Sequence, residues 1–225
     1  MAPPAAPAEA TRPILRDALG IAVASGAYAI AFGAISTAAG LTLPQTLVMS
    51  SVMFTGASQF AMVGVIGGGG SVWAGAFTAV LLGTRNAFYS LRLASLLQVR
   101  GRLRPLAAQF VLDETTAMAI ARDDPRLGRY AFWATGVALF TFWNTGTLLG
   151  ALATQAISDP KVFGLDAAVP AAFLALLAPR LRAREPFAIA VVAAVVAIAV
   201  LPFVPAGVPL LIVAVLVGLF GLLRP

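Results

Sequence analysis

The run Phe54–Phe60, with the sequence FTGASQF, is the first place where this chain could bind a ligand. Its hydroxyl and amide side chains lie in an apolar stretch, beside residues small enough to expose the backbone. A helix broken at such a run offers backbone groups that can hold an ammonium or a carboxylate. The alternative is that the small residues only pack two helices, with Gln59 bonded to a neighbouring helix. The candidate ligand-binding residues here are Thr55, Gly56, Ala57, Ser58 and Gln59.

A second group of candidates surrounds Arg85. On a helix, Arg85, Tyr89 and Arg92 recur at i, i+4 and i+7 and therefore share one face. A guanidinium in an apolar segment needs a carboxylate partner, supplied by the chain or by a ligand. We expect Arg85, with Asn86 and Tyr89, to contact a ligand or a buried acid. The alternative is that the arginines reach the membrane surface, which suits Arg92 better than Arg85.

Asp113 and Glu114 form an adjacent acidic pair inside a predominantly apolar segment. Neighbouring residues on a helix point about 100° apart, so the two carboxylates cannot face one partner. We expect one to pair with an arginine such as Arg85, while the other accepts a proton or a ligand amine. A carboxylate held away from water can take up a proton near neutral pH and couple transport to protons. Equally, both could be solvated at the membrane surface.

The elements that position these residues must cross a membrane. Residues 18–84 contain no Lys, Arg, Asp or Glu, and 60% of the 225 residues are hydrophobic. A bilayer core takes about 20 apolar residues per crossing. We therefore predict an all-α fold, a polytopic helical membrane protein. The chain is too short to add a soluble catalytic domain, and it has no Cys and no His, so we expect no enzyme activity, no cofactor and no metal site.

The predicted organisation is a disordered lead at residues 1–13 and a single transmembrane transporter domain at residues 14–225. Glycines and prolines divide the domain into about seven to eight hydrophobic segments. We expect one or two of these helices to be interrupted or re-entrant. The segments are residues 18–41, 43–66, 71–95, 105–121, 130–153, 166–179, 187–201 and 205–223.

The net charge of +6 comes from short arginine clusters that flank apolar runs. This pattern is typical of cytoplasmic loops and does not indicate nucleic-acid binding. If the clusters at Arg16, Arg100 and Arg122 are all cytoplasmic, an even number of crossings must separate neighbouring clusters. We therefore predict that residues 105–121 form a re-entrant or protein-buried helix, and that residues 43–66 or 71–95 are interrupted and return to their starting side. The alternative is an extracellular N-terminus.

Four marks make the chain resemble the AzlC-type permease family, the large subunit of branched-chain amino-acid exporters. They occur in the family's order over about residues 14–223, and the first is the most specific. The family pattern commonly has a His directly after the arginine, where this chain has Asn86, so a proton-coupling role for that His does not carry over. The marks are Phe54–Phe60, Arg85 with Tyr89 and Arg92, Leu112–Glu114, and Val169–Leu174.

The resemblance implies a secondary transporter subunit in the bacterial cytoplasmic (inner) membrane. Its substrates would be Leu, Ile and Val, with Met as a further candidate, and its partner a small membrane subunit of the AzlD type. Residues 56–59 would contact the amino-acid head group, and Arg85 would hold the carboxylate or stabilise the acidic helix. Proton coupling would then fall to Asp113 or Glu114. The alternative is a non-transporting assembly or scaffold subunit, in which Arg85 and the acidic pair are structural.

Overall fold

The structure, a computed structural model, describes residues 8–155, 174, 178, 180–204 and 208–222. Every element in this part of the chain is a helix, as predicted. The expected segment 166–179 and the run 169–174 lie outside the described residues, apart from 174 and 178. The helices are α1 (Ala8–Ala38), α2 (Leu43–Met53), α3 (Ala57–Gly67), α4 (Val72–Leu97), α5 (Leu103–Gln109), α6 (Asp113–Ile120), α7 (Pro125–Gln155), η2 (Arg180–Arg182), α9 (Arg184–Val200), η3 (Leu201–Phe203) and α10 (Val208–Leu222).

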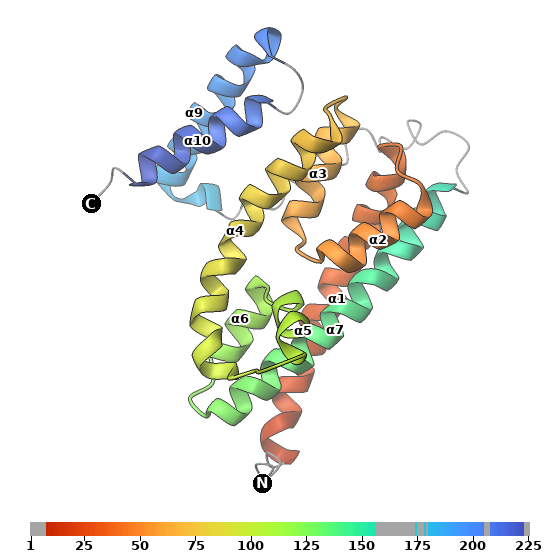
Figure 1. Cartoon of the computed structure of the whole chain (residues 1–225), viewed down its shortest axis with the longest axis vertical. Coiled ribbons are helices and arrows are strands. Elements are labelled where there is room, and N and C mark those ends of the chain that lie inside the picture. The colour runs from red at the N-terminus through yellow and green to blue at the C-terminus, as the bar shows by residue number, and fades with distance from the viewer. Residues whose placement is uncertain (1–7, 156–173, 175–177, 179, 205–207, 223–225) are drawn as a thin grey trace.

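Two long helices, α1 and α7, run side by side in the same direction (Figure 1). Glycines let their backbones touch: a Cβ on Gly146 would overlap the carbonyl of Gly26, and a Cβ on Gly150 would overlap that of Ile30. Small residues spaced four apart are a common means of close helix packing in membranes. The α1–α7 pair therefore forms the frame against which the remaining helices pack.

The predicted segment 43–66 is interrupted, since α2 ends at Met53 and α3 begins at Ala57. The hairpin returns to its starting end: a Cβ on Gly67, at the end of α3, would lie 3.1 Å from Cβ of Ala39, which follows α1. Gly56 in the break has a φ of 62°, a left-handed conformation that glycine adopts without steric cost. The interruption expected for this part of the chain is therefore confirmed in the first of its two candidate segments.

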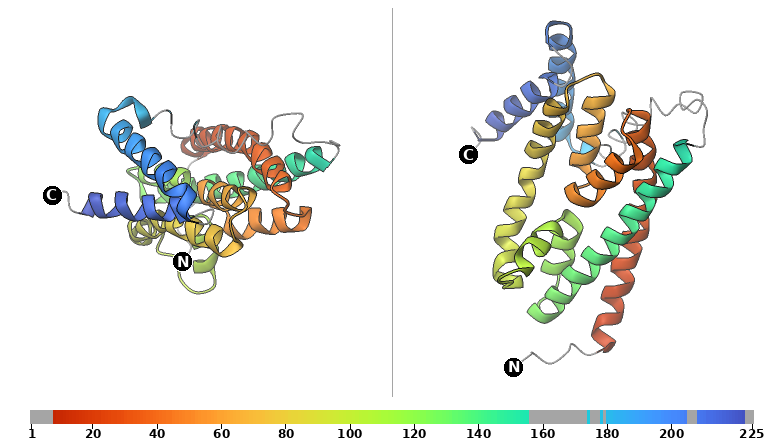
Figure 2. Two further views of the ribbon diagram at one scale, coloured as in Figure 1. Left: turned by 90° about the horizontal axis from the view of Figure 1, so that it is seen from above. Right: turned by 45° about the vertical axis from the view of Figure 1, so that its right-hand side comes forward.

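The predicted segment 105–121 is also interrupted, between α5 and α6. A Cβ on Gly128, near the start of α7, would lie 2.8 Å from the carbonyl oxygen of Ala119 and 3.3 Å from Leu96. The end of α6 therefore lies at the end of α4, where α5 also starts, and the segment returns to the end of the bundle at which it begins. In two views the hairpins α2–α3 and α5–α6 occupy the space between α4 and the α1–α7 pair (Figures 1 and 2).

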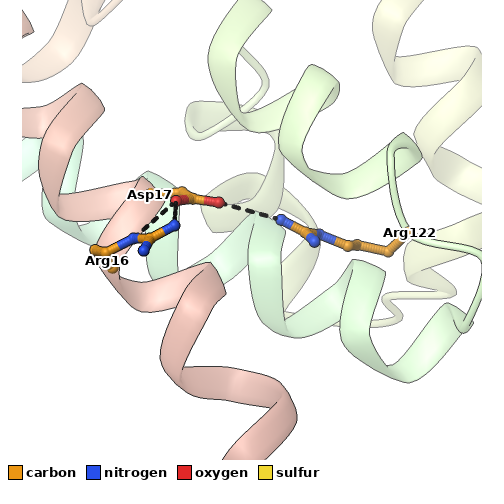
Figure 3. Close-up of polar contacts among 3 residues, drawn as sticks. All are labelled: Arg16, Asp17 and Arg122. Atoms are coloured by element: carbon orange, nitrogen blue, oxygen red, sulfur yellow. Dashed lines mark hydrogen bonds and ion pairs between the residues drawn. The ribbon is translucent and has the colours of Figure 1, made fainter.

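The first three basic clusters lie at one end of this bundle. Arg122 contacts Asp17 of α1 at 3.6 Å, and Asp17 also accepts from Arg16 at 3.2 Å (Figure 3). On the other side, the guanidinium of Arg129 donates to the carbonyl of Leu96 at 2.8 Å. With two re-entrant hairpins, α1 and α4 separate the first two clusters by an even number of long helices. The charge pattern therefore fits an N-terminus at the basic end.

Helix α1 begins earlier than the sequence indicates, because residues 8–13 of the expected disordered lead are helical. Pro13 lies close enough to the start of the helix that little of the hydrogen-bond ladder precedes it. Ile14 and Ala18 are buried against Met118 and Ala131, and this packing extends the helix beyond the apolar tract. Residues 1–7 lie outside the described part of the chain.

Three described helices are long and apolar enough to cross a membrane, at Glu9–Ala38, Pro125–Thr154 and Arg184–Phe203. Two shorter apolar helices lie at Ala57–Gly67 and Leu211–Gly221. The expected seven to eight segments are therefore not confirmed as spans. Two of them are split into half-helices, and α4 carries Arg85 and Arg92 in its interior. Helices α9 and α10 pack mainly on each other, and α9 has no buried residue.

Replacing Gly150 by Ala should destabilise the frame. The added Cβ would overlap the backbone carbonyl of Ile30, which no side-chain rearrangement can relieve. Overpacking of this kind costs about 1–3 kcal/mol. We expect a lower Tm for the detergent-solubilised Gly150→Ala chain in a thermal denaturation experiment.

The matched control is Gly20→Ala on α1, because nothing lies within 4 Å of a Cβ at this position. Its Tm should equal or exceed that of the unchanged chain, since Ala favours a helix over Gly. Equal Tm values for the two variants would show that α1 and α7 are not in backbone contact.

Candidate functional site

A cavity of about 390 Å³ lies where the two broken helices meet. Its walls come from five parts of the chain: the middle of α1, the α2–α3 break, α4, the start of α6 and the middle of α7. No single helix could enclose this space, so only the packed bundle creates it. The lining residues are Ala24, Ser25, Tyr28, Phe54, Thr55, Gly56, Ala57, Arg85, Leu112, Asp113, Glu114, Leu139 and Trp143.

The charged side chains of the cavity come from two helices, α4 and α6. Arg85 of α4 and Asp113 of α6 form a salt bridge of 2.9 Å between Nη1 and Oδ2, with side-chain exposures of 34% and 39%. The bridge joins Arg85 to one acid of the adjacent pair, and it is partly exposed where the sequence suggested a buried pair. Glu114 lines the same cavity and forms no salt bridge to any described residue. The site thus offers one carboxylate engaged by a guanidinium and one available to a ligand.

Four polar atoms on the cavity walls have no hydrogen-bond partner among the described residues. They are the hydroxyl of Tyr28, Oγ1 of Thr55, Oδ1 of Asp113 and the indole Nε1 of Trp143. Buried polar groups in proteins are normally hydrogen-bonded, so a set of unpaired donors and acceptors around one space indicates a polar ligand or ordered water. Tyr28 and Trp143 were not predicted, because an isolated aromatic in an apolar helix resembles any core residue.

Aromatic and aliphatic side chains form the rest of the wall. The ring of Tyr28 packs on Phe60 with centroids 4.8 Å apart, and its centroid is 6.3 Å from that of Trp143. Phe54 and Leu112 stand at the two breaks. Such a wall suits a ligand that has an apolar part and a charged head. Within the described residues no cluster of three or more acidic side chains is suited to a metal ion.

Gln59 has a different position from the one expected, because it is fully buried and does not line the cavity. Its Oε1 accepts from the backbone N–H of Gly56 at 3.0 Å. Its Nε2 donates to the carbonyls of Met49 at 3.2 Å and Ser50 at 3.5 Å. The side chain therefore joins the end of α2 to the start of α3, and it stabilises the break from the side that faces away from the cavity.

Gln109, at the end of α5, completes this arrangement and was missed by the sequence reasoning. Its Nε2 donates to the carbonyls of Ser51 at 2.7 Å and Val52 at 3.1 Å. The last carbonyls of a helix have no partner within it and cannot find water inside a membrane. Two glutamine side chains thus satisfy consecutive carbonyls of α2. A polar amide four residues before the acidic pair was the available signal.

The remaining predicted residues lie near the cavity but not on it. Ser58 is buried, has an unpaired Oγ and faces α4 across Gly83, whose Cβ would lie 3.7 Å away. Asn86 also has an unpaired buried oxygen, and Tyr89 packs against the hydrophobic core. Arg92 is exposed, as expected for an arginine that reaches the surface. Thr55, Gly56, Ala57, Arg85, Asp113 and Glu114 are therefore the predicted residues that share the cavity.

Replacing Gln59 by Leu should destabilise the chain without touching the cavity wall. The change leaves the N–H of Gly56 and two carbonyls of α2 without their partners, and each unsatisfied buried group costs about 1–3 kcal/mol. We expect a clearly lower Tm in detergent. The control is Ser95→Ala, an exposed hydroxyl bonded only to its own helix, which should leave Tm unchanged. A Gln59→Leu chain as stable as Ser95→Ala would contradict the assigned role.

Comparisons with known proteins identify the family of the chain. The AzlC protein family matches residues 20–157, which contain every residue of the cavity. The chain is 28% identical to "Inner membrane protein YgaZ" of Escherichia coli (strain K12), over 76% of the chain and 73% of that protein. It is 30% identical to an "Uncharacterized membrane protein" of Archaeoglobus fulgidus, over 70% of the chain and 69% of that protein. No solved structure matches. The chain is therefore a membrane protein that belongs to the AzlC protein family.

Proposed function

We propose that this chain is the large subunit of a secondary transporter that exports branched-chain amino acids across the bacterial cytoplasmic membrane. The observation that carries the proposal is the cavity itself. One guanidinium, two carboxylates and three further polar atoms without a partner among the described residues meet an aromatic wall at the junction of two broken helices. Broken helices at such a depth form the substrate sites of many secondary transporters. A small membrane subunit of the AzlD type is the proposed partner.

A branched-chain amino acid offers partners to Glu114, to Arg85 and to one of the unpaired polar atoms, the hydroxyl of Thr55. Its ammonium is placed at Glu114, and its carboxylate accepts from Arg85 and from the hydroxyl of Thr55. Arg85 has donors beyond the one that contacts Asp113, because a guanidinium carries five N–H groups. The aliphatic side chain lies against Leu139 and Trp143. At about 390 Å³ the cavity is at the lower end of the usual range of about 300–1,000 Å³ for small ligands.

Glu114 is the proposed proton carrier. Asp113 is held by Arg85, whereas Glu114 has no salt-bridge partner among the described residues. A proton and the substrate ammonium then compete for the same carboxylate. Protonation from one side of the membrane releases the ammonium, and loss of that proton on the other side restores the site. Competition of this kind couples two opposite fluxes through a single group.

The Glu114→Gln variant tests whether this carboxylate carries the proton and holds the ammonium. In proteoliposomes that contain the chain and its partner, we expect leucine flux driven by a pH gradient to fall by about tenfold or more, equivalent to a rise of at least about 1.4 kcal/mol in the barrier to transport. Exchange of labelled for unlabelled leucine should fall as well, because a neutral amide, like the protonated acid, does not hold the substrate ammonium. Arg92→Gln, an exposed change on α4, is the control and should keep both fluxes. Unchanged gradient-driven flux in Glu114→Gln would contradict the assignment.

A scaffold role is the second candidate, since the Arg85–Asp113 bridge joins α4 to α6. The bridge is partly exposed, and pairs of this kind contribute about 0–1 kcal/mol. The Arg85→Lys and Asp113→Asn chains should therefore fold, keep their partner and lose leucine flux. Loss of partner association in both variants, measured by co-purification, would instead support the scaffold.

A further inference from the structure

Two stretches of the chain are built alike. Each consists of a helix broken in two, a turn and a long helix: α2, α3 and α4 in the first stretch, and α5, α6 and α7 in the second. Both breaks are three residues long, and each begins with a phenylalanine, Phe54 or Phe110. The turns that follow, at residues 68–71 and 121–124, are equally long. One shared feature could arise by chance. Here the break, its first residue, the turn and the long helix all recur in the same order in both stretches.

The two breaks are also stabilised in the same way. The third residue of the second half-helix accepts the backbone N–H at the break: Gln59 accepts from Gly56 at 3.0 Å, and Thr115 accepts from Leu112 at 2.9 Å. Each side chain then donates back across the break. Gln59 donates to the carbonyls of α2, and Thr115 donates to the carbonyl of Phe110 at 2.6 Å. Different residue types therefore perform one structural task at equivalent positions.

A glycine occupies the fourth position of each long helix. A Cβ on Gly75 of α4 would lie 3.1 Å from the carbonyl oxygen of Met62 in α3, and a Cβ on Gly128 of α7 would lie 2.8 Å from that of Ala119 in α6. Each glycine thus allows the long helix to pack tightly on the second half-helix of its own stretch. The likeness of the two stretches extends from the breaks into their packing.

The two stretches are inverted relative to each other. Helix α4 runs toward the basic end of the bundle and α7 runs away from it (Figure 1), and Arg129 near the start of α7 contacts Leu96 near the end of α4. The equivalent residues Phe54 and Phe110 contact each other, with ring centroids 6.3 Å apart. Contact between equivalent residues is the mark of a two-fold axis. The axis passes beside the cavity, whose wall contains residues 54–57 of one break and residues 112–114 of the other break and α6.

We propose that the hairpins α2–α3 and α5–α6 are two symmetry-related gates, which open the cavity alternately to opposite sides of the membrane. The α2–α3 gate closes the end remote from the first three arginine clusters, and the α5–α6 gate closes the basic end. The α1–α7 frame stays fixed, because its backbones are in contact. Inverted repeats around a central site are a known basis for alternating access. This inference rests on the proposed transport function, but not on the identity of the substrate.

The chain has no Cys, so single thiols can report access to the cavity in the otherwise unchanged protein. Ser25→Cys places a thiol on the α1 wall with a change of one atom. We expect a membrane-impermeant thiol reagent to label it in right-side-out and in inside-out vesicles that contain the full complex. Reversal of the pH gradient should change the ratio of the two labelling rates. Labelling from one side only, under both gradients, would overturn the two-gate arrangement.

A tether between the gates provides the second measurement. A short bifunctional thiol reagent across Phe54→Cys/Phe110→Cys should reduce leucine flux by about tenfold or more relative to the same variant without the reagent. The same tether across Ala18→Cys/Ala131→Cys, in the buried α1–α7 contact, should leave flux unchanged. Equal flux with and without the tether between the gates would reject the proposal. If that variant does not fold, the Ser25→Cys labelling decides alone.

The two measurements also separate this inference from the proposed substrate. If Ser25→Cys is labelled from both sides but the complex does not transport leucine, the two-gate proposal stands and the branched-chain substrate is rejected. If Ser25→Cys is labelled from one side only but the complex transports leucine, the transport function stands and the two-gate proposal is rejected.

Discussion

The arrangement depends on one constraint: a backbone that leaves a helix inside a membrane must still have its hydrogen bonds satisfied. The α2–α3 break meets this constraint with side chains. Gln59 and Gln109 together bond the carbonyls of residues 49–52, and Gln59 also accepts from Gly56. At the second break Thr115 accepts from the backbone N–H of Leu112 and donates to the carbonyl of Phe110. Without these bonds each break would expose unpaired backbone to lipid, and the chain would favour continuous helices.

The backbone at the α2–α3 break is hydrogen-bonded, whereas several polar side chains on the cavity wall have no partner among the described residues. Behind the break the amide groups of Gln59 and Gln109 are engaged, whereas on the cavity wall Tyr28, Thr55 and Trp143 carry polar atoms with no partner among the described residues. The contrast separates two kinds of polar residue in an apolar bundle. The amides that hold the break are already bonded, whereas these three polar atoms on the cavity wall can bond a ligand. This distinction moves Gln59 from the proposed binding set to the scaffold of the break.

Close packing of α1 on α7 gives the bundle a rigid reference. The contact runs through glycines on both helices, so little freedom remains between them. Polar bonds also join α2 to this frame: Ser51 of α2 donates to Asn144 of α7 at 2.8 Å, and Ser50 donates to Thr147 at 3.1 Å. These bonds also place the first hairpin against the frame. The site therefore lies between the closely packed α1–α7 pair and a hairpin that is joined to this pair by side-chain hydrogen bonds.

The sequence by itself determined the membrane class. It also predicted an interruption in residues 43–66 or 71–95, a re-entrant or protein-buried helix in residues 105–121, and a carboxylate partner for Arg85 from the pair 113–114 or from a ligand. Those properties follow from local composition, from charge spacing and from the rule that a buried charge needs a partner. The tertiary structure alone decided that Gln59 faces away from the cavity and that Tyr28, Gln109 and Trp143 belong to the site or its support. It also decided that α1 continues back to Ala8. The physical reason is that side-chain direction across a break, and contacts between residues far apart in the chain, depend on how the helices pack and leave no periodic signal in the sequence.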